Sequence, residues 1–180
     1  MESGSDDGLV ASEDEMQKFL RQFPDEPRRE QVTNWLADVE LARLNRRLER
    51  ISRSPIPSRN VRPIEQLLLK AIRIETTDPA SAARKLQGIL AMFSAGEPLS
   101  DEDQRCVVLA RRRLLQLTRA ANDNRQQQQV LVDERLKIAA EAAKEDPETA
   151  RRIWQGIIDL YQEDLWAREY VNEARRLLDE

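Results

Sequence analysis

The sequence contains one sixteen-residue segment twice, as DPASAARKLQGILAMF at residues 78–93 and as DPETARRIWQGIIDLY at residues 146–161. The copies share Asp, Pro, Ala, Arg, Gln, Gly and Ile at matching positions, and large apolar residues replace one another at several others. The opening Asp-Pro favours a helix start, because the carboxylate accepts free backbone N–H groups and proline suits the first helical position. A duplicated amphipathic helix is typical of helical repeat proteins.

Helical periodicity covers most of the remaining chain, and no stretch alternates with period two for long enough to predict a strand. We therefore expect an all-α fold of about seven helices, arranged as helical-hairpin repeats in a solenoid or right-handed array. The expected parts are a disordered acidic tail at residues 1–11, a helical hairpin at 12–52, a Pro- and Arg-rich linker at 53–63, and two repeat units at 64–121 and 122–180.

Local signals set these boundaries. Ser12 and Glu15 have capping-box spacing, three prolines interrupt the linker, and Asn122-Asp123-Asn124 predicts a break or bend between the units. The Arg-Arg-Leu-Leu sequences at 112–115 and 175–178 suggest that the duplication extends into the helix after each repeated segment. A long helix is expected from about Arg28 to Ile51, and it carries two apolar stripes, which predicts a hairpin partner on one side and the main body on the other.

Composition argues against several classes of function. The formal charge of −4 favours solubility rather than a nucleic-acid role, and no apolar run approaches the roughly 18 residues that span a bilayer. The first residues lack the basic and apolar regions of a signal peptide, so we expect a cytoplasmic location, or a soluble part of a longer or membrane-anchored protein. Histidine is absent, and no phosphate-binding glycine loop or GxSxG, HExxH or CxxC motif occurs. We expect no enzyme activity, cofactor or metal, and we expect Cys106 to be a small core residue.

The pattern of Asp-Pro-x-x-Ala, a large apolar residue, Ile-Ile and Tyr resembles the tetratricopeptide-like repeat. It is most similar to the subtype of bacterial outer-membrane assembly lipoproteins and kinase-associated repeat regions. The segment FLRQFPD at 19–25, followed by Val32 and Leu36, resembles the same turn and suggests a third, degenerate copy. The 68-residue offset from Asp78 to Asp146 departs from the family pattern, because it is about twice a standard repeat. The resemblance implies protein or peptide binding and no catalytic residues.

Gly88 and Gly156 occupy matching positions inside the two repeated helices, where glycine costs about 1 kcal/mol relative to alanine. Two interpretations are open: close approach of a neighbouring helix, which we favour, and a groove floor where a ligand backbone binds. Ala82 and Ala150, also at matching positions, are expected to pack the repeats.

Three tryptophans, Trp35, Trp154 and Trp166, are candidates for partner contacts, because tryptophan is enriched among energetically dominant interface residues. Trp154 lies on an apolar stripe and is expected in the core. Trp166 lies slightly off the main stripe of the last helix, so we prefer it as the exposed anchor.

A basic stretch from Arg43 to Arg62 includes the candidate partner-binding residues Arg46, Arg47 and Arg50. Such a stretch can meet the phosphates of nucleic acid or anionic lipid, but it lacks interleaved aromatic residues, so a solvated helix face is favoured and nucleic acid is not expected. Residues 1–15 are acidic, and we hypothesise that they fold back and mask these arginines.

These observations predict a non-enzymatic module that binds an unidentified protein or peptide on a helical repeat surface. The alternative is an architectural, self-associating domain of a larger bacterial assembly. In that case the two-striped helix would leave one apolar stripe for a second copy and form a homodimer. A carboxylate-based enzyme is the least expected class.

Overall fold

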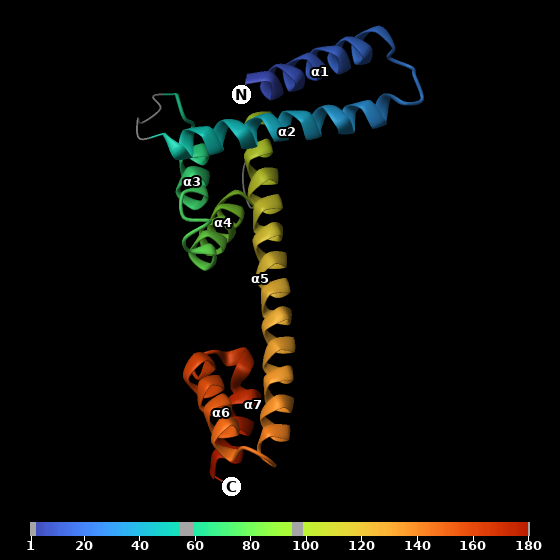
Figure 1. Cartoon of the computed structure of the whole chain (residues 1–180). Coiled ribbons are helices and arrows are strands. Elements are labelled where there is room, and N and C mark those ends of the chain that lie inside the picture. The colour runs from blue at the N-terminus through green and yellow to red at the C-terminus, as the bar shows by residue number, and fades with distance from the viewer. Residues whose placement is uncertain (1–2, 55–59, 95–98, 180) are drawn as a thin grey trace. The chain divides into compact units, whose positions relative to one another are not determined.

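The computed structural model describes residues 3–54, 60–94 and 99–179, and every regular element within these ranges is helical, which confirms the all-α prediction (Figure 1). The chain divides into two compact units, unit 1 at Met1–Thr118 and unit 2 at Arg119–Glu180. The boundary falls within the long helix α5. The elements are α1 (Ser3–Gln22), α2 (Arg29–Arg53), α3 (Pro63–Ile72), α4 (Pro79–Ser94), α5 (Asp101–Ala142), α6 (Pro147–Tyr161), the 3₁₀-helix η1 (Leu165–Ala167) and α7 (Arg168–Asp179).

Unit 1 is built around α2. Helix α1 runs antiparallel to α2 as a hairpin partner, while α3 contacts both α2 and α4 (Figure 1). The core of this unit contains Leu48, Leu68, Leu86 and Cys106, each at most 1% exposed. The two stripes of α2 have the expected separate neighbours. Val32 is buried in the half that pairs with α1, and Leu41 and Leu48 belong to the core that includes α3, α4 and the start of α5.

Unit 2 packs α6 and α7 with the C-terminal part of α5. Its core contains Trp154, which is 6% exposed and therefore lies in the core as predicted. Small residues that are almost completely buried belong to the same core. Four of these are alanines: Ala139, Ala150, Ala167 and Ala174. The small side chains leave room for the large indole, whose Nε1 has no hydrogen-bond partner.

Both copies of the repeated segment bury the same positions. Ala82 and Ala150 are completely buried, which agrees with the packing role expected of them. The other matched buried pairs are Leu86 with Trp154 and Ile89 with Ile157. The repeated sequence therefore encodes the same buried helix face in each unit.

The N-terminal hydrogen bonds of the repeated helices are also duplicated. Asp78 accepts the N–H of Ser81 at 2.9 Å, and Asp146 accepts the N–H of Thr149 at 3.2 Å. In each copy an arginine one turn further on donates to the side-chain hydroxyl of the same residue, Arg84 to Ser81 at 2.8 Å and Arg152 to Thr149 at 3.0 Å. Hydrogen bonds from the Ser81 and Thr149 side chains and N–H groups hold the pKa values of the two aspartates below their ordinary value. The predicted Asp-Pro helix starts are thus confirmed.

The duplication extends into the flanking helices, and after the repeat its register differs from the one that the Arg-Arg-Leu-Leu match predicts. Before the repeat, buried residues match at the same 68-residue offset, Ile64 with Val132 and Ala71 with Ala139. After it, Val107 with Val171 and Ala110 with Ala174 match at an offset of 64. The two Arg-Arg-Leu-Leu sequences lie 63 apart and are one residue out of register, so Arg113 is buried whereas Arg176 is exposed. One residue rotates a helical side chain by about 100°, which moves it to another face.

Two helix boundaries differ from expectation. Helix α1 begins at Ser3 rather than Ser12, so residues 3–11, expected as a disordered tail, are helical. The Ser12 hydroxyl donates to the carbonyl of Gly8 at 2.8 Å, a bond that an interior helical serine makes in place of capping. Helix α5 also continues through Asn122-Asp123-Asn124, because each of these residues costs about 0.7 kcal/mol or less in a helix and no Gly or Pro interrupts it. Residues 55–59 of the expected linker lie outside the described residues.

Candidate functional site

Unit 1 contains a cavity of about 490 Å³ that is lined by five arginines and four glutamates, together with two apolar side chains. We call it the arginine pocket. Four helices contribute to it, with α2 supplying the largest share. The lining residues are Val10 and Glu13 from α1; Glu40, Arg43, Leu44, Arg47 and Arg50 from α2; Arg62 and Glu65 from the start of α3; and Glu102 and Arg105 from the start of α5.

The sequence of α2 places its share of the pocket on one side of the helix. Glu40, Arg43, Arg47 and Arg50 follow one another at steps of three and four residues, and such residues are neighbours on a helix surface. Leu44, on the same side, also packs against the unit 1 core. The pocket wall is therefore anchored by the core, and the arginine side chains extend from a helix held by that core.

Ion pairs between different helices hold most of the pocket arginines. Arg43 pairs with Glu13 of α1, Arg47 pairs with Glu65 of α3, and Arg105 pairs with Glu40 at 2.8 Å. The side chains of these three arginines remain 40–48% exposed. Each guanidinium is thus oriented by an internal carboxylate and still accessible to water.

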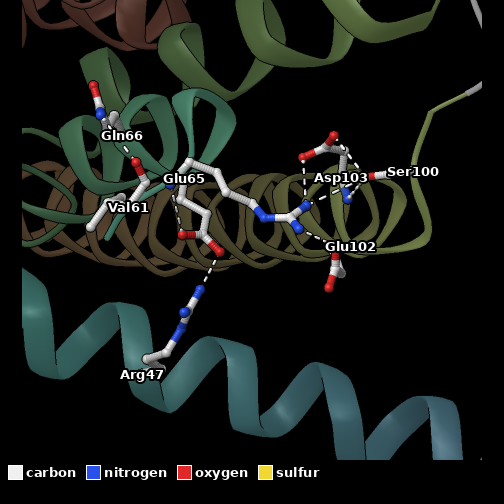
Figure 2. A network of polar contacts seen from close by, with 8 residues as sticks. Arg47, Val61, Glu65, Gln66, Ser100, Glu102 and Asp103 are labelled. Atoms are coloured by element: carbon white, nitrogen blue, oxygen red, sulfur yellow. Dashed lines mark hydrogen bonds and ion pairs between the residues drawn. The ribbon is translucent and has the colours of Figure 1, made fainter. Parts of the chain in front are cut away.

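Figure 2 shows the α3 end of the pocket, where Arg47 reaches from α2 to Glu65. Glu65 is only 4% exposed and also accepts the backbone N–H of Arg62 at 3.2 Å. Arg62 in turn pairs with Glu102 and, at 3.4 Å, with Asp103 in the first turn of α5. Desolvation lowers the pKa of Arg62. The hydrogen bonds that it donates to Glu102 and Asp103, and the negative charges of these residues, outweigh desolvation and hold this pKa above its ordinary value. The network fixes the starts of α3 and α5 against α2.

A buried polar cluster within unit 1 is centred on a single arginine, Arg113. Arg113 of α5 is 7% exposed and donates two hydrogen bonds to Asn45 Oδ1, at 2.7 and 3.0 Å. It also pairs with Glu49 at 2.5 Å and with Glu75. The burial of Arg113 was not predicted from the sequence. The available signal was its position, since Cys106, Ala110, Arg113 and Leu117 recur at steps of four and three.

Cys106 is 1% exposed, as predicted for a core residue. Burial, followed by the charges of Glu65 and Asp103, raises the pKa of its thiol to about 12. The thiolate, which is the nucleophilic form, is therefore strongly disfavoured at neutral pH.

The predicted partner-binding residues separate in the structure. Arg47 and Arg50 line the pocket, while Arg46 is exposed and is not part of the lining. Trp166 is not the exposed anchor that we expected, because its ring packs between Tyr161, at a centroid distance of 5.3 Å, and Tyr170, at 6.2 Å. The exposed tryptophan is Trp35, whose residue exposure is 49%.

The two repeated glycines do not mark close helix packing, so the favoured interpretation is wrong. A methyl group added at Gly88 or Gly156 would meet no atom of the structure within 4 Å, neighbouring chain atoms aside. Gly88 is exposed and Gly156 is partly exposed, because both lie away from the buried face that their helices share. The packing role belongs instead to Ala82 and Ala150 on the buried face.

Comparisons with protein-family models, with curated proteins and with solved structures find no match to the chain. In the described ranges, His, Cys, Asp and Glu side chains form no group of three or more placed to hold a metal ion. None of the helices described is both long and apolar enough to span a bilayer.

Proposed function

We propose that this chain is a non-enzymatic interaction module that binds an acidic segment of a protein or peptide at the arginine pocket. The observation that carries the proposal is the convergence of partly exposed guanidinium groups on one cavity, most of them oriented by an internal carboxylate. Guanidinium groups bind carboxylates through paired, planar hydrogen bonds. The resemblance of the repeated segment to tetratricopeptide-like repeats supports the same class of function.

The internal ion pairs do not prevent such binding. The Arg43–Glu13 and Arg105–Glu40 pairs are partly exposed at both partners, and such pairs contribute only about 0–1 kcal/mol each, so a ligand carboxylate can replace the internal one at small cost. Glu65 is buried, so the Arg47–Glu65 pair stays, and Arg47 binds the ligand through its other guanidinium N–H groups. The pocket also contains Val10 and Leu44, which offer apolar contacts to a peptide side chain. The four glutamates of the lining and the net charge of −4 disfavour a long polyanion such as nucleic acid more than a short acidic peptide.

Neither apolar stripe of α2, the feature that suggested self-association, is left for a second copy. The two apolar stripes of α2 have separate intramolecular neighbours, α1 on one side and the unit 1 core on the other. Light scattering over a concentration series tests this alternative, and a persistent dimer would favour it over a binding module.

The direct test is fluorescence anisotropy with a labelled, unstructured peptide rich in Glu and Asp. The variant Arg43→Gln/Arg47→Gln removes two pocket charges. Arg84→Gln/Arg152→Gln is the matched control, because it removes two exposed charges from α4 and α6. We expect the pocket variant to weaken binding about tenfold or more, since one charged hydrogen bond contributes about 1.5–3 kcal/mol, and the control to change it less than about twofold.

Equal losses in the two variants would show that binding follows net charge alone, and would refute the proposal. The same titration with single-stranded DNA tests the alternative ligand. Tighter binding of DNA than of the peptide would identify the pocket as a polyanion site instead.

A further inference from the structure

Helix α1 is held to unit 1 less firmly than the helices of the core. It contacts α2, yet none of its described side chains, at residues 8–22, is fully buried. Helix α3 is only ten residues long and has six buried residues. The apolar area that α1 removes from water per residue is therefore much smaller, and helices with few buried contacts are the first to open locally.

Helix α1 nevertheless supplies one wall of the arginine pocket. Val10 and Glu13 line it, and Glu13 pairs with Arg43. At the other end of the helix, Phe19 and Phe23 contact each other at a ring distance of 5.3 Å, and Phe23 is 50% exposed. Helix α1 is thus an amphipathic helix with a carboxylate at the pocket end and half-buried apolar residues beyond it.

The surface of α2 beneath α1 has the complementary pattern. Val32, Leu36 and Val39 recur at steps of four and three, and Arg43 follows four residues later. Removal of α1 would leave a short apolar stripe that ends at a guanidinium group on the edge of the pocket. Such a stripe is the surface on which an amphipathic helix binds by laying down its apolar face.

We propose that α1 is an exchangeable occupant of this surface, and that the physiological partner is an acidic amphipathic helix that replaces α1. The inference rests on the proposed function, because Arg43 belongs to the arginine pocket, and it specifies both the partner and its regulation. The partner presents a carboxylate to Arg43 and apolar residues to Val32, Leu36 and Val39. Helix α1 acts as the intramolecular competitor, with an effective concentration on the order of millimolar.

The experiment offers α1 to the protein as a separate peptide. A fluorescein-labelled peptide of residues 3–23 is titrated with the full chain and with the full-length variant Met16→Asp/Leu20→Asp, which weakens the attachment of its own α1. Val108→Asp/Leu115→Asp is the matched control, because it changes two apolar residues of α5 that are 43% and 48% exposed. We expect the α1 variant to bind the peptide at least about tenfold more tightly than the wild type, and the control to match the wild type.

The peptide itself carries a second control. Glu13→Gln and Asp14→Asn remove one charge each at adjacent positions, but Asp14 is exposed and Glu13 contacts Arg43. We expect only Glu13→Gln to weaken binding. If circular dichroism shows that the Met16→Asp/Leu20→Asp chain loses its fold, the full-length variant Glu13→Lys replaces it, since this variant reverses one ion-pair partner and leaves the apolar contacts intact.

Two outcomes would overturn the inference. One is peptide affinity that does not rise when α1 is weakened. The other is a wild-type dimer that exchanges α1 between copies, which would make a second copy the occupant. The proposed function fails separately, if the unstructured acidic peptide binds the wild type without dependence on Arg43 and Arg47.

Discussion

Replacement of Arg113 by methionine should destabilise unit 1 by about 2–3 kcal/mol. The methionine keeps the apolar stem of the side chain but removes every hydrogen bond to Asn45, Glu49 and Glu75. Breaking a fully buried ion pair costs about 3–5 kcal/mol, because it leaves an uncompensated charge. Arg113 has a side-chain exposure of 8%, but Glu75 and Glu49 retain 20% and 37%, so water compensates part of that loss.

Hydrogen exchange measures this effect in each unit separately. The amides of α2 and α3 should lose protection by the stated amount, while those of α6 and α7 in unit 2 serve as the internal control. The triple variant Arg113→Met/Glu49→Gln/Glu75→Gln should recover at least half of the loss, because it removes the unpaired charges. Unchanged protection in the single variant, or a triple variant as unstable as the single one, would contradict this reasoning.

Three further predictions concern the repeated helices and the unit boundary. Gly88→Ala and Gly156→Ala should each raise the free energy of unfolding by up to about 1 kcal/mol in urea titrations, since the added methyl meets no obstacle, and destabilisation would restore the packing interpretation. Asp78 and Asp146 have lowered pKa values, so the stability that their caps contribute is present above their ordinary pKa of 3.8 and is lost as the pH falls below it. In thermal melts at acid pH, the melting temperature of Asp→Asn variants should therefore fall less steeply with pH than that of the wild type. Identical pH profiles would contradict this prediction. Within α5 and unit 2, limited trypsin digestion should cut first after Arg119 or Arg125, because residues 118–127 are all exposed, and earlier cleavage within α6 would refute that prediction.

The features that depend on local chemistry were predictable from the sequence. Asp78 caps α4 and Asp146 caps α6 because a side-chain oxygen needs only the next turn of backbone N–H groups. The buried faces at Ala82 and Ala150 follow from helical periodicity alone, since these alanines lie in register with large apolar residues. These inferences succeed because their causes lie within a few residues, and because proline after the capping aspartate stops a preceding helix from continuing. The local signals at Ser12 and Asn122–Asn124 lack such a stop, and a helix runs through each of them.

The features that depend on distant residues were not predictable. Gly156 was expected at a close helix contact, but whether a neighbour approaches a glycine is decided by the packing of other helices. Arg113 is buried among partners that lie 38 to 68 residues away in the chain, so no local pattern reveals them. The arginine pocket was only partly anticipated. Arg47 and Arg50 were candidates, but Arg105 and Glu65 join them only through the fold.

An NMR titration of the isotopically labelled full chain with the acidic peptide tests the central claim most directly, because it locates the bound peptide. The claim predicts that the side-chain Nε–H signals of Arg43 and Arg47 shift most, while those of Arg84 and Arg152 on α4 and α6 stay in place. Shifts concentrated in unit 2, or spread evenly over all exposed arginines, would contradict a binding site at the arginine pocket.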